Sequence, residues 1–110
     1  MPREDRLIIF SYSEFYNALY ALSTQRSLQK PPTGAVTGVV ENPDGFTDKI
    51  RVEIHNPIAK VDKDITVDYA RDFAVAALML YCRSQSIPLP KTAQKSVMVR
   101  KGEVMLRVQI

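Results

Sequence analysis

Segments of strand pattern and segments of helical pattern follow one another along the chain. The strand segments are short apolar runs or stretches in which apolar and polar residues alternate, while the helical segments repeat apolar residues at intervals of three or four. Stretches rich in glycine and proline separate them. The pattern predicts strands at residues 6–10, 35–41, 49–55, 96–100 and 103–110, and helices at about residues 12–28 and 66–85.

Three short motifs mark where these elements begin or turn. Ser11 and Glu14 have the spacing of a capping box, so the first helix is expected to begin just after the serine. The Asn-Pro-Asp-Gly sequence at residues 42–45 is expected to join two strands, because proline presets φ and glycine accepts positive φ. Lys101 and Gly102 are expected to close a hairpin between the last two strands, with the glycine in the left-handed region.

The longest apolar run, residues 73–82, indicates a buried helix. It is about half as long as the roughly twenty residues that cross a bilayer, so no membrane insertion is expected. Thr66 and Asp68 are expected to open this helix, because acidic side chains are favoured at the positive end of the helix dipole. The core is expected where the helix meets the sheet, with Phe73, Ala77, Leu80 and Tyr81 against Ile50, Val52, Ile54, Val104 and Leu106.

The expected order, β-α-β-β-α-β-β, predicts the α+β class, with two helices packed on one face of a mainly antiparallel sheet. The first six elements match the order of ferredoxin-like folds, to which the last strand would be an addition. With 110 residues, of which 45% are hydrophobic and 25% charged, the chain has the size and composition of one domain over residues 1–110. No internal repeat or long linker is evident in the sequence.

Few residues suit catalysis or metal binding. The one cysteine, Cys82, lies in the apolar run, and the one histidine, His55, lies at a predicted strand end, so the chain has too few ligands for a zinc site. A buried thiol stays neutral, which argues against a nucleophilic pair of these two residues. No glycine-rich loop joins a strand to a helix, as a phosphate loop would. The sequence predicts no catalytic residue, metal or cofactor and favours a protein that is not an enzyme.

The C-terminal quarter of the chain is strongly basic. Residues 83–110 carry six bases against the single acid Glu103, whereas the whole chain has a net charge of only +3. A patch of one sign raises the local concentration of oppositely charged ligands. The candidate patch for an anionic partner comprises Arg83, Lys91, Lys95, Arg100, Lys101 and Arg107. Lys91 and Lys95 precede the hairpin whose turn carries Arg100 and Lys101, so these four are expected to share one edge of the fold. Solvated surface side chains are the alternative interpretation.

Tyr12, Tyr16 and Tyr20 form a stripe at intervals of four along the first predicted helix. A tyrosine ring has an apolar face and a polar tip, so the stripe could form a surface for a protein partner or a platform for stacked bases. Packing at the margin of the core is the simpler interpretation, because a helix that covers a sheet needs such side chains on one side. The stripe remains a candidate partner surface.

Two hypotheses of different class follow. The first is a small non-catalytic protein-interaction module that binds itself or another protein, because the C-terminal strand stays apolar to Ile110 at an expected open edge, and Met98 and Met105 fall opposite the valines. The second is a nucleic-acid-binding domain that uses the basic hairpin, although no aromatic residue follows Tyr81. A lone cysteine and a charged N-terminus without an apolar signal core favour the cytoplasm.

Overall fold

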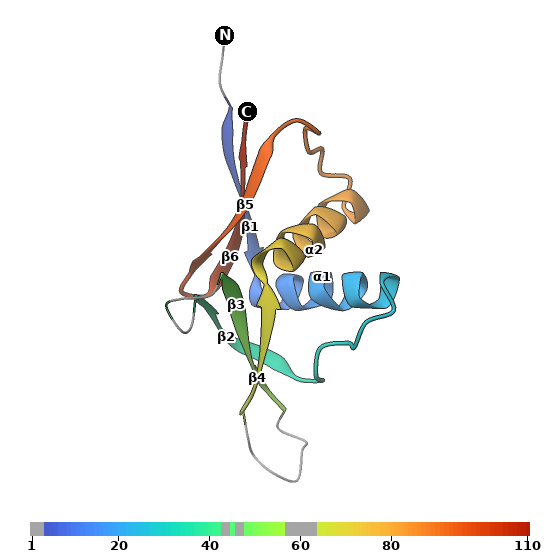
Figure 1. Ribbon diagram of the computed structural model, residues 1–110, viewed down its shortest axis with the longest axis vertical. Helices are drawn as coiled ribbons and strands as arrows, with labels where there is room; N and C mark the ends of the chain where they lie inside the picture. The colour runs from blue at the N-terminus through green and yellow to red at the C-terminus, as the bar shows by residue number, and fades with distance from the viewer. Residues whose placement is uncertain (1–3, 43–44, 46–47, 57–63) are drawn as a thin grey trace.

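The chain forms two helices and two antiparallel three-stranded sheets, an α+β architecture, in the computed structural model (Figure 1). The structure describes residues 4–42, 45, 48–56 and 64–110. In chain order the elements are β1 (Asp5–Ser11), α1 (Tyr12–Gln25), β2 (Ala35–Glu41), β3 (Lys49–His55), β4 (Asp64–Ala70), α2 (Arg71–Ser84), β5 (Gln94–Arg100) and β6 (Glu103–Gln109). The predicted class is confirmed, but the order contains one strand more than the sequence pattern indicates.

The strands divide between two sheets instead of forming the single sheet that was expected. One sheet has the order β1-β6-β5 and the other β2-β3-β4, and every described strand pair is antiparallel. The ferredoxin-like order does not apply, because its split β-α-β unit needs parallel strands. The first strand of the chain pairs with the last, so β6 lies in the middle of its sheet. The open edge expected at the C-terminal strand is therefore wrong.

The segment before α2 is a strand, whereas the sequence was expected to start the helix there. β4 pairs with β3 along its whole length. Thr66 and Asp68, which were expected to open the helix, lie inside this strand, and α2 begins at Arg71. The Asp68 carboxylate accepts two hydrogen bonds from Arg51 of β3, at 2.8 and 3.2 Å. The acidic side chain is thus explained by a cross-strand pair and not by a helix dipole.

The predicted capping box is present at the start of α1. Ser11 Oγ accepts a hydrogen bond from the Glu14 amide at 3.2 Å, and Glu14 Oε1 accepts one from the Ser11 amide at 2.9 Å. The bond from the Ser11 amide holds the pKa of the Glu14 carboxyl below its ordinary value. The direct passage from β1 into α1 is therefore fixed by the residues that the sequence indicates.

Of the two predicted turns, the one at Lys101 and Gly102 is confirmed, and the one at residues 42–45 is described only in part. Lys101 and Gly102 close the hairpin between β5 and β6, with Gly102 at a φ of 84°, in the left-handed region that favours glycine. In the predicted turn at 42–45, residues 43 and 44 lie outside the described part of the chain. The Gly45 amide donates to the Asn42 carbonyl at 2.9 Å.

The two halves of the fold repeat one arrangement, β-α-β-β. Every strand in the described part of the chain has 7 residues, and both described helices have 14. The same number of residues separates the starts of three pairs of equivalent elements. β1 starts at Asp5 and β4 at Asp64, α1 at Tyr12 and α2 at Arg71, and β2 at Ala35 and β5 at Gln94. The expectation of no internal repeat is therefore wrong at the level of structure.

Both helices also end in the same way. The residue after each C-cap is a serine in the left-handed region, Ser27 at a φ of 55° and Ser86 at a φ of 57°. The next amide donates back to a carbonyl of the last turn at 2.8 Å in each half, from Leu28 to Ser23 and from Ile87 to Cys82. This is the Schellman arrangement. Its recurrence at the same interval supports a residue-by-residue correspondence between the halves.

The two halves exchange their first strands. β1 belongs to the first half and pairs with β6 of the second, while β4 belongs to the second half and pairs with β3 of the first. Each sheet thus combines a hairpin of one half with a strand of the other. The helices pack against each other and lie to the same side of the strands (Figure 1). Neither sheet is complete without both halves.

The core lies between the helices and the inner faces of the two sheets. The strand residues predicted for it, Ile50, Val52, Ile54, Val104 and Leu106, are each 0% exposed. On α2, Ala77 is buried as predicted, but Phe73, Leu80 and Tyr81 are only partly buried. Leu78 is fully buried instead. The difference arises because α2 also packs against α1, so its buried side is not set by the sheet alone.

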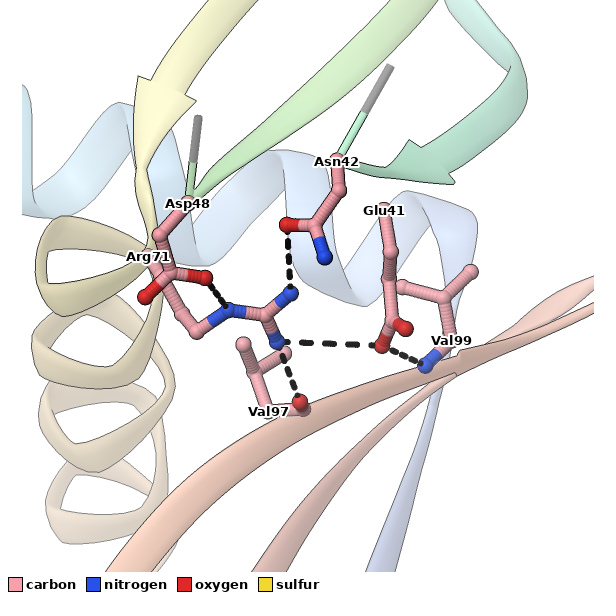
Figure 2. Close-up of polar contacts among 6 residues, drawn as sticks. All are labelled: Glu41, Asn42, Asp48, Arg71, Val97 and Val99. Carbon is pink, nitrogen blue, oxygen red and sulfur yellow. Dashed lines mark hydrogen bonds and ion pairs between the residues drawn. The ribbon is translucent and has the colours of Figure 1, made fainter. Parts of the chain in front are cut away.

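Polar side chains join the two sheets where β5 approaches β2 (Figure 2). Arg71 Nη1 donates to the Val97 carbonyl at 2.8 Å, and Glu41 Oε1 accepts a hydrogen bond from the Val99 amide at 2.8 Å. Both backbone groups lie on the edge of β5 that faces away from β6. The side chains of Arg71 and Glu41 therefore satisfy an edge that a neighbouring strand would otherwise pair with.

The same arginine also holds the turn between β2 and β3. Its Nη2 donates to Asn42 Oδ1 at 3.2 Å, and its Nε donates to the Asp48 carboxylate. Tyr12 has the equivalent place at the start of α1, and its hydroxyl accepts a hydrogen bond from the Gly102 amide in the β5–β6 turn at 2.9 Å. The first residue of each helix thus forms hydrogen bonds to the turn of a β-hairpin: Arg71 to the β2–β3 turn and Tyr12 to the β5–β6 turn.

Candidate functional site

The outer face of the β1-β6-β5 sheet, turned away from the helices, has an apolar centre. Ile9, Met105 and Met98 form one row across the three strands, because Met105 is the cross-strand partner of both others. Leu7 lies two residues from Ile9 on the same face, and these two side chains are 45% and 55% exposed. The outer apolar patch is the name used below for Leu7, Ile9, Met98 and Met105. The two methionines lie opposite the buried valines, as predicted.

Polar side chains surround the outer apolar patch. Arg107 donates to the Asp5 carboxylate through Nε at 3.1 Å and through Nη2 at 2.7 Å. This pair lowers the pKa of the Asp5 carboxyl. The row on the other side of the patch consists of Ser11, Glu103 and Arg100. An apolar centre within a polar rim is the usual composition of a protein interface.

The two outermost strands, β1 and β4, differ in how their edges are protected. On β4 the face turned away from the helices carries Asp64 and Asp68, and charged side chains discourage the addition of another strand. On β1 the same face carries a single acid, Asp5, at the start of the strand, followed by the exposed apolar side chains Leu7 and Ile9. Within the described residues, no segment pairs with the outer edge of β1. Of these two edges, that of β1 is the less protected by charged side chains.

Two of the three tyrosines of the predicted stripe, Tyr12 and Tyr16, form hydrogen bonds within the fold. Tyr16 donates its hydroxyl hydrogen to the Pro32 carbonyl at 3.0 Å, and Tyr12 holds the β5–β6 turn as described above. Both rings are partly buried against the core. Tyr20 is 40% exposed, and Lys30 Nζ lies 5.5 Å from its ring centroid. Of the predicted surface, only Tyr20 presents a largely exposed ring.

The six predicted bases are divided among three places. Arg107 is paired with Asp5 on the outer face, Arg100 and Lys101 lie at the β5–β6 turn, and Arg83, Lys91 and Lys95 line a hollow beside α2. Side chains five residues apart on a strand point to opposite faces, so Lys95 and Arg100 cannot share one surface. The bases do not form the single edge that was expected, and the hollow beside α2 is where three of them meet.

His55 and Cys82 do not offer an activated nucleophile. His55 Nδ1 lies 2.9 Å from Asp64 Oδ1 in a cross-strand pair of β3 and β4. Cys82 is 0% exposed on α2, and burial raises the pKa of its thiol. In the described ranges, no three His, Cys, Asp or Glu side chains gather closely enough to hold a metal ion.

The sequence pattern predicts a strand at residues 6–10 but did not identify Leu7 and Ile9 as exposed. The available signal was the apolar pair Leu7 and Ile9, which in an alternating strand cannot lie on the same face as Ile8 and Phe10. When a strand has apolar residues on both faces, either both faces are buried or one face is exposed to solvent. β1 is at the edge of a three-stranded sheet, and its face with Leu7 and Ile9 is exposed.

No protein family model, curated protein or solved structure matches this chain. None of the described helices is both long and apolar enough to span a bilayer. Function must therefore be inferred from the geometry of the chain itself.

Proposed function

We propose that the chain is a non-catalytic protein-interaction module that associates with a second copy of itself through β1. The observation that carries this proposal is the unprotected outer edge of β1 beside two exposed apolar side chains, Leu7 and Ile9. Backbone groups along a free edge can be satisfied by a strand from another chain. A second copy placed there would also cover part of the outer apolar patch.

The sequence of β1 suits pairing with itself. Around a twofold axis the two strands run antiparallel, and pairing centred on Ile8 places Leu7 opposite Ile9 of the second copy, and the reverse. The two exposed apolar side chains then pack against each other on one face. Asp5 lies opposite Ser11 of the second copy, so no like charges oppose one another.

The association is expected to be weak. Leu7 and Ile9 are each about half exposed, and burying both in each of the two copies would contribute about 1 kcal/mol per side chain, or about 4 kcal/mol in all, before the cost of association; Met105 is already 0% exposed and adds nothing. Backbone hydrogen bonds along one strand add to this. Because about 4 kcal/mol corresponds to a dissociation constant of about 1 mM, we expect a dissociation constant between roughly high micromolar and millimolar, which places the interface among the small ones.

Sedimentation equilibrium from micromolar to millimolar concentration tests the proposal. The native chain should pass from monomer to dimer as concentration rises, whereas the Ile9→Lys variant should remain a monomer, because a lysine opposes the apolar contact. The matched control is Ile65→Lys, on the other outer strand, where the side chain is 42% exposed. A native chain that stays monomeric at millimolar concentration, or two variants that dimerise alike, would contradict the proposal.

The alternative, a nucleic-acid-binding domain that uses the basic hairpin, has weaker support. The hairpin turn carries only Arg100 and Lys101, and Arg107 is already paired with Asp5. Titration of duplex DNA in low salt decides between the two. Tight binding that is lost in an Arg100→Glu, Lys101→Glu double variant would favour this alternative over the interaction module.

A further inference from the structure

A hollow of about 330 Å³ lies beside the C-terminal end of α2. Its apolar side is made by Met79 of α2 and by the segment that follows the helix. Three bases lie around it. The lining residues are Met79, Arg83, Ile87, Pro88, Leu89, Lys91 and Lys95. The hollow therefore combines an apolar surface with a concentration of positive charge.

None of these bases has its charge neutralised within the described part of the chain. Lys95 Nζ donates to the Ala93 carbonyl at 3.2 Å, and no ion pair of Arg83 or Lys91 is found there. A fourth base, Arg6 of β1, donates from Nη2 to the carbonyl of Pro88, which lines the hollow, at 3.1 Å. Its Nε is buried without a hydrogen-bond partner among the described residues. Arg6 does not itself line the hollow, so its charge lies behind the wall that Pro88 forms.

The internal repeat supplies a comparison within the same molecule. The end of α1 has its own hollow, of about 470 Å³, and four of its lining residues, Leu28, Gln29, Lys30 and Pro32, correspond to Ile87, Pro88, Leu89 and Lys91. At the positions equivalent to Arg6, Arg83, Lys91 and Lys95, the other half carries Ile65, Thr24, Pro32 and Val36.

All four equivalents are uncharged, although both halves fold alike to the last turn of each helix. The fold itself therefore does not require a base at any of the four positions. The dipole of α2 favours Arg83 in its last turn, but it does not account for Lys91 and Lys95, which lie beyond the helix. The hollow beside α2 is lined by three bases, whereas Lys30 is the one base among the described residues that line the hollow beside α1. The positive charge is therefore concentrated in one half, as at a binding site for an anion.

We propose that this hollow binds a small anion that carries an apolar group. The anionic head, a phosphate or carboxylate, would lie among Arg83, Lys91 and Lys95, and the apolar group would lie against Met79, Ile87 and Leu89. The site goes beyond self-association and lies on α2, the segment after it and the start of β5, where Lys95 is on the face opposite to the outer apolar patch. A ligand could therefore bind to a monomer as well as to a dimer.

The test is an amide NMR titration in low salt with three probes: phenyl phosphate, inorganic phosphate as the head alone, and phenol as the apolar group alone. Phenyl phosphate should bind about tenfold more tightly than either part, because both kinds of contact are made only by the whole molecule. Its shift changes should be confined to the described residues from Met79 to Lys95, and the affinity should fall as salt is added.

The variant Arg83→Thr, Lys95→Val carries the residues of the other half, so the fold should tolerate it, and it should bind phenyl phosphate at least tenfold more weakly. The matched control, Arg100→Gln, Lys101→Gln, removes the same charge at the hairpin turn and should bind as the native chain does. Equal affinity of the two variants would overturn the proposal. Two results on the native chain would also overturn it. One is that inorganic phosphate binds as tightly as phenyl phosphate, and the other is that the shift changes fall outside the hollow.

Discussion

Replacing Arg71 tests whether polar side chains hold the two sheets together. Arg71→Met keeps most of the stem and removes the guanidinium, which is bonded to Val97, Asn42 and Asp48 and lies 3.8 Å from Glu41. The Arg71 side chain is only 19% exposed, so its bond to the Val97 carbonyl is worth about 1 to 2 kcal/mol. The bonds to the more exposed turn contribute about 1 kcal/mol together. A loss of about 2 to 3 kcal/mol in the free energy of unfolding is expected.

Urea denaturation at pH 7 measures this loss as a lower midpoint at unchanged slope. Arg71→Lys should recover only part of it, because a lysine cannot reach three acceptors in different directions. The control is Arg51→Met, which breaks an ion pair on the outer face of β3 whose side chains are 39% and 35% exposed, and which should cost less than about 1 kcal/mol. A loss below about 0.5 kcal/mol for Arg71→Met would show that apolar packing alone joins the sheets.

Two further predictions concern the helix ends. Ser27→Gly and Ser86→Gly should each stabilise the fold by about 0.5 kcal/mol, because glycine accepts positive φ. Thermal unfolding should show a similar gain in stability for both variants. A loss of stability at either position would contradict the correspondence between the halves. Glu14→Gln should cost about 0.5 kcal/mol at pH 7. Since the folded pKa of Glu14 is lowered from 4.5, its contribution is present above that value and lost as pH falls through the lowered pKa, so an equal cost at pH 3 would refute it.

Local signals in the sequence predicted most elements correctly. The capping box at Ser11 and Glu14 and the glycine turn at Gly102 act through neighbouring residues, so they need no knowledge of the rest of the fold. β4 was missed although Ile65 and Val67 alternate with polar residues, because its two acids suggested a helix N-terminus. The alternation was the stronger signal, since side-chain period is tied directly to the backbone.

Strand pairing and the internal repeat could not be predicted in this way. Pairing of β1 with β6 joins the two ends of the described fold, and no local pattern specifies it. The repeat is not evident in the sequence, because equivalent positions of the two halves are alike in burial more often than in residue type. Leu19 and Leu78 are fully buried and identical, whereas Ser23 and Cys82 are both buried but are different residues. A core selects for size and polarity, so the correspondence is visible only once the elements are placed.

The candidate sites were predicted in part. Composition alone indicated the basic C-terminal region, but the register of β1 and β6 brings Asp5 to Arg107, and the two faces of β5 separate Lys95 from Arg100. These are effects of tertiary structure. The contact of Arg6 with Pro88, which lines the hollow, joins residues far apart in sequence, so no local pattern indicates it.

The pairing of β1 with β6 also has a consequence for the synthesis of the chain. Of the described strands, β1 leaves the ribosome first and its only partner strand leaves last. Strands β2, β3 and β4 pair with their neighbours in sequence as they emerge, but β1 must wait for the whole of the second half. Throughout that interval the segment that carries Leu7 and Ile9 lacks its partner strand. If chains associate through β1 as proposed, neighbouring nascent chains on one messenger RNA have both edges of that segment available for association before any of them is complete.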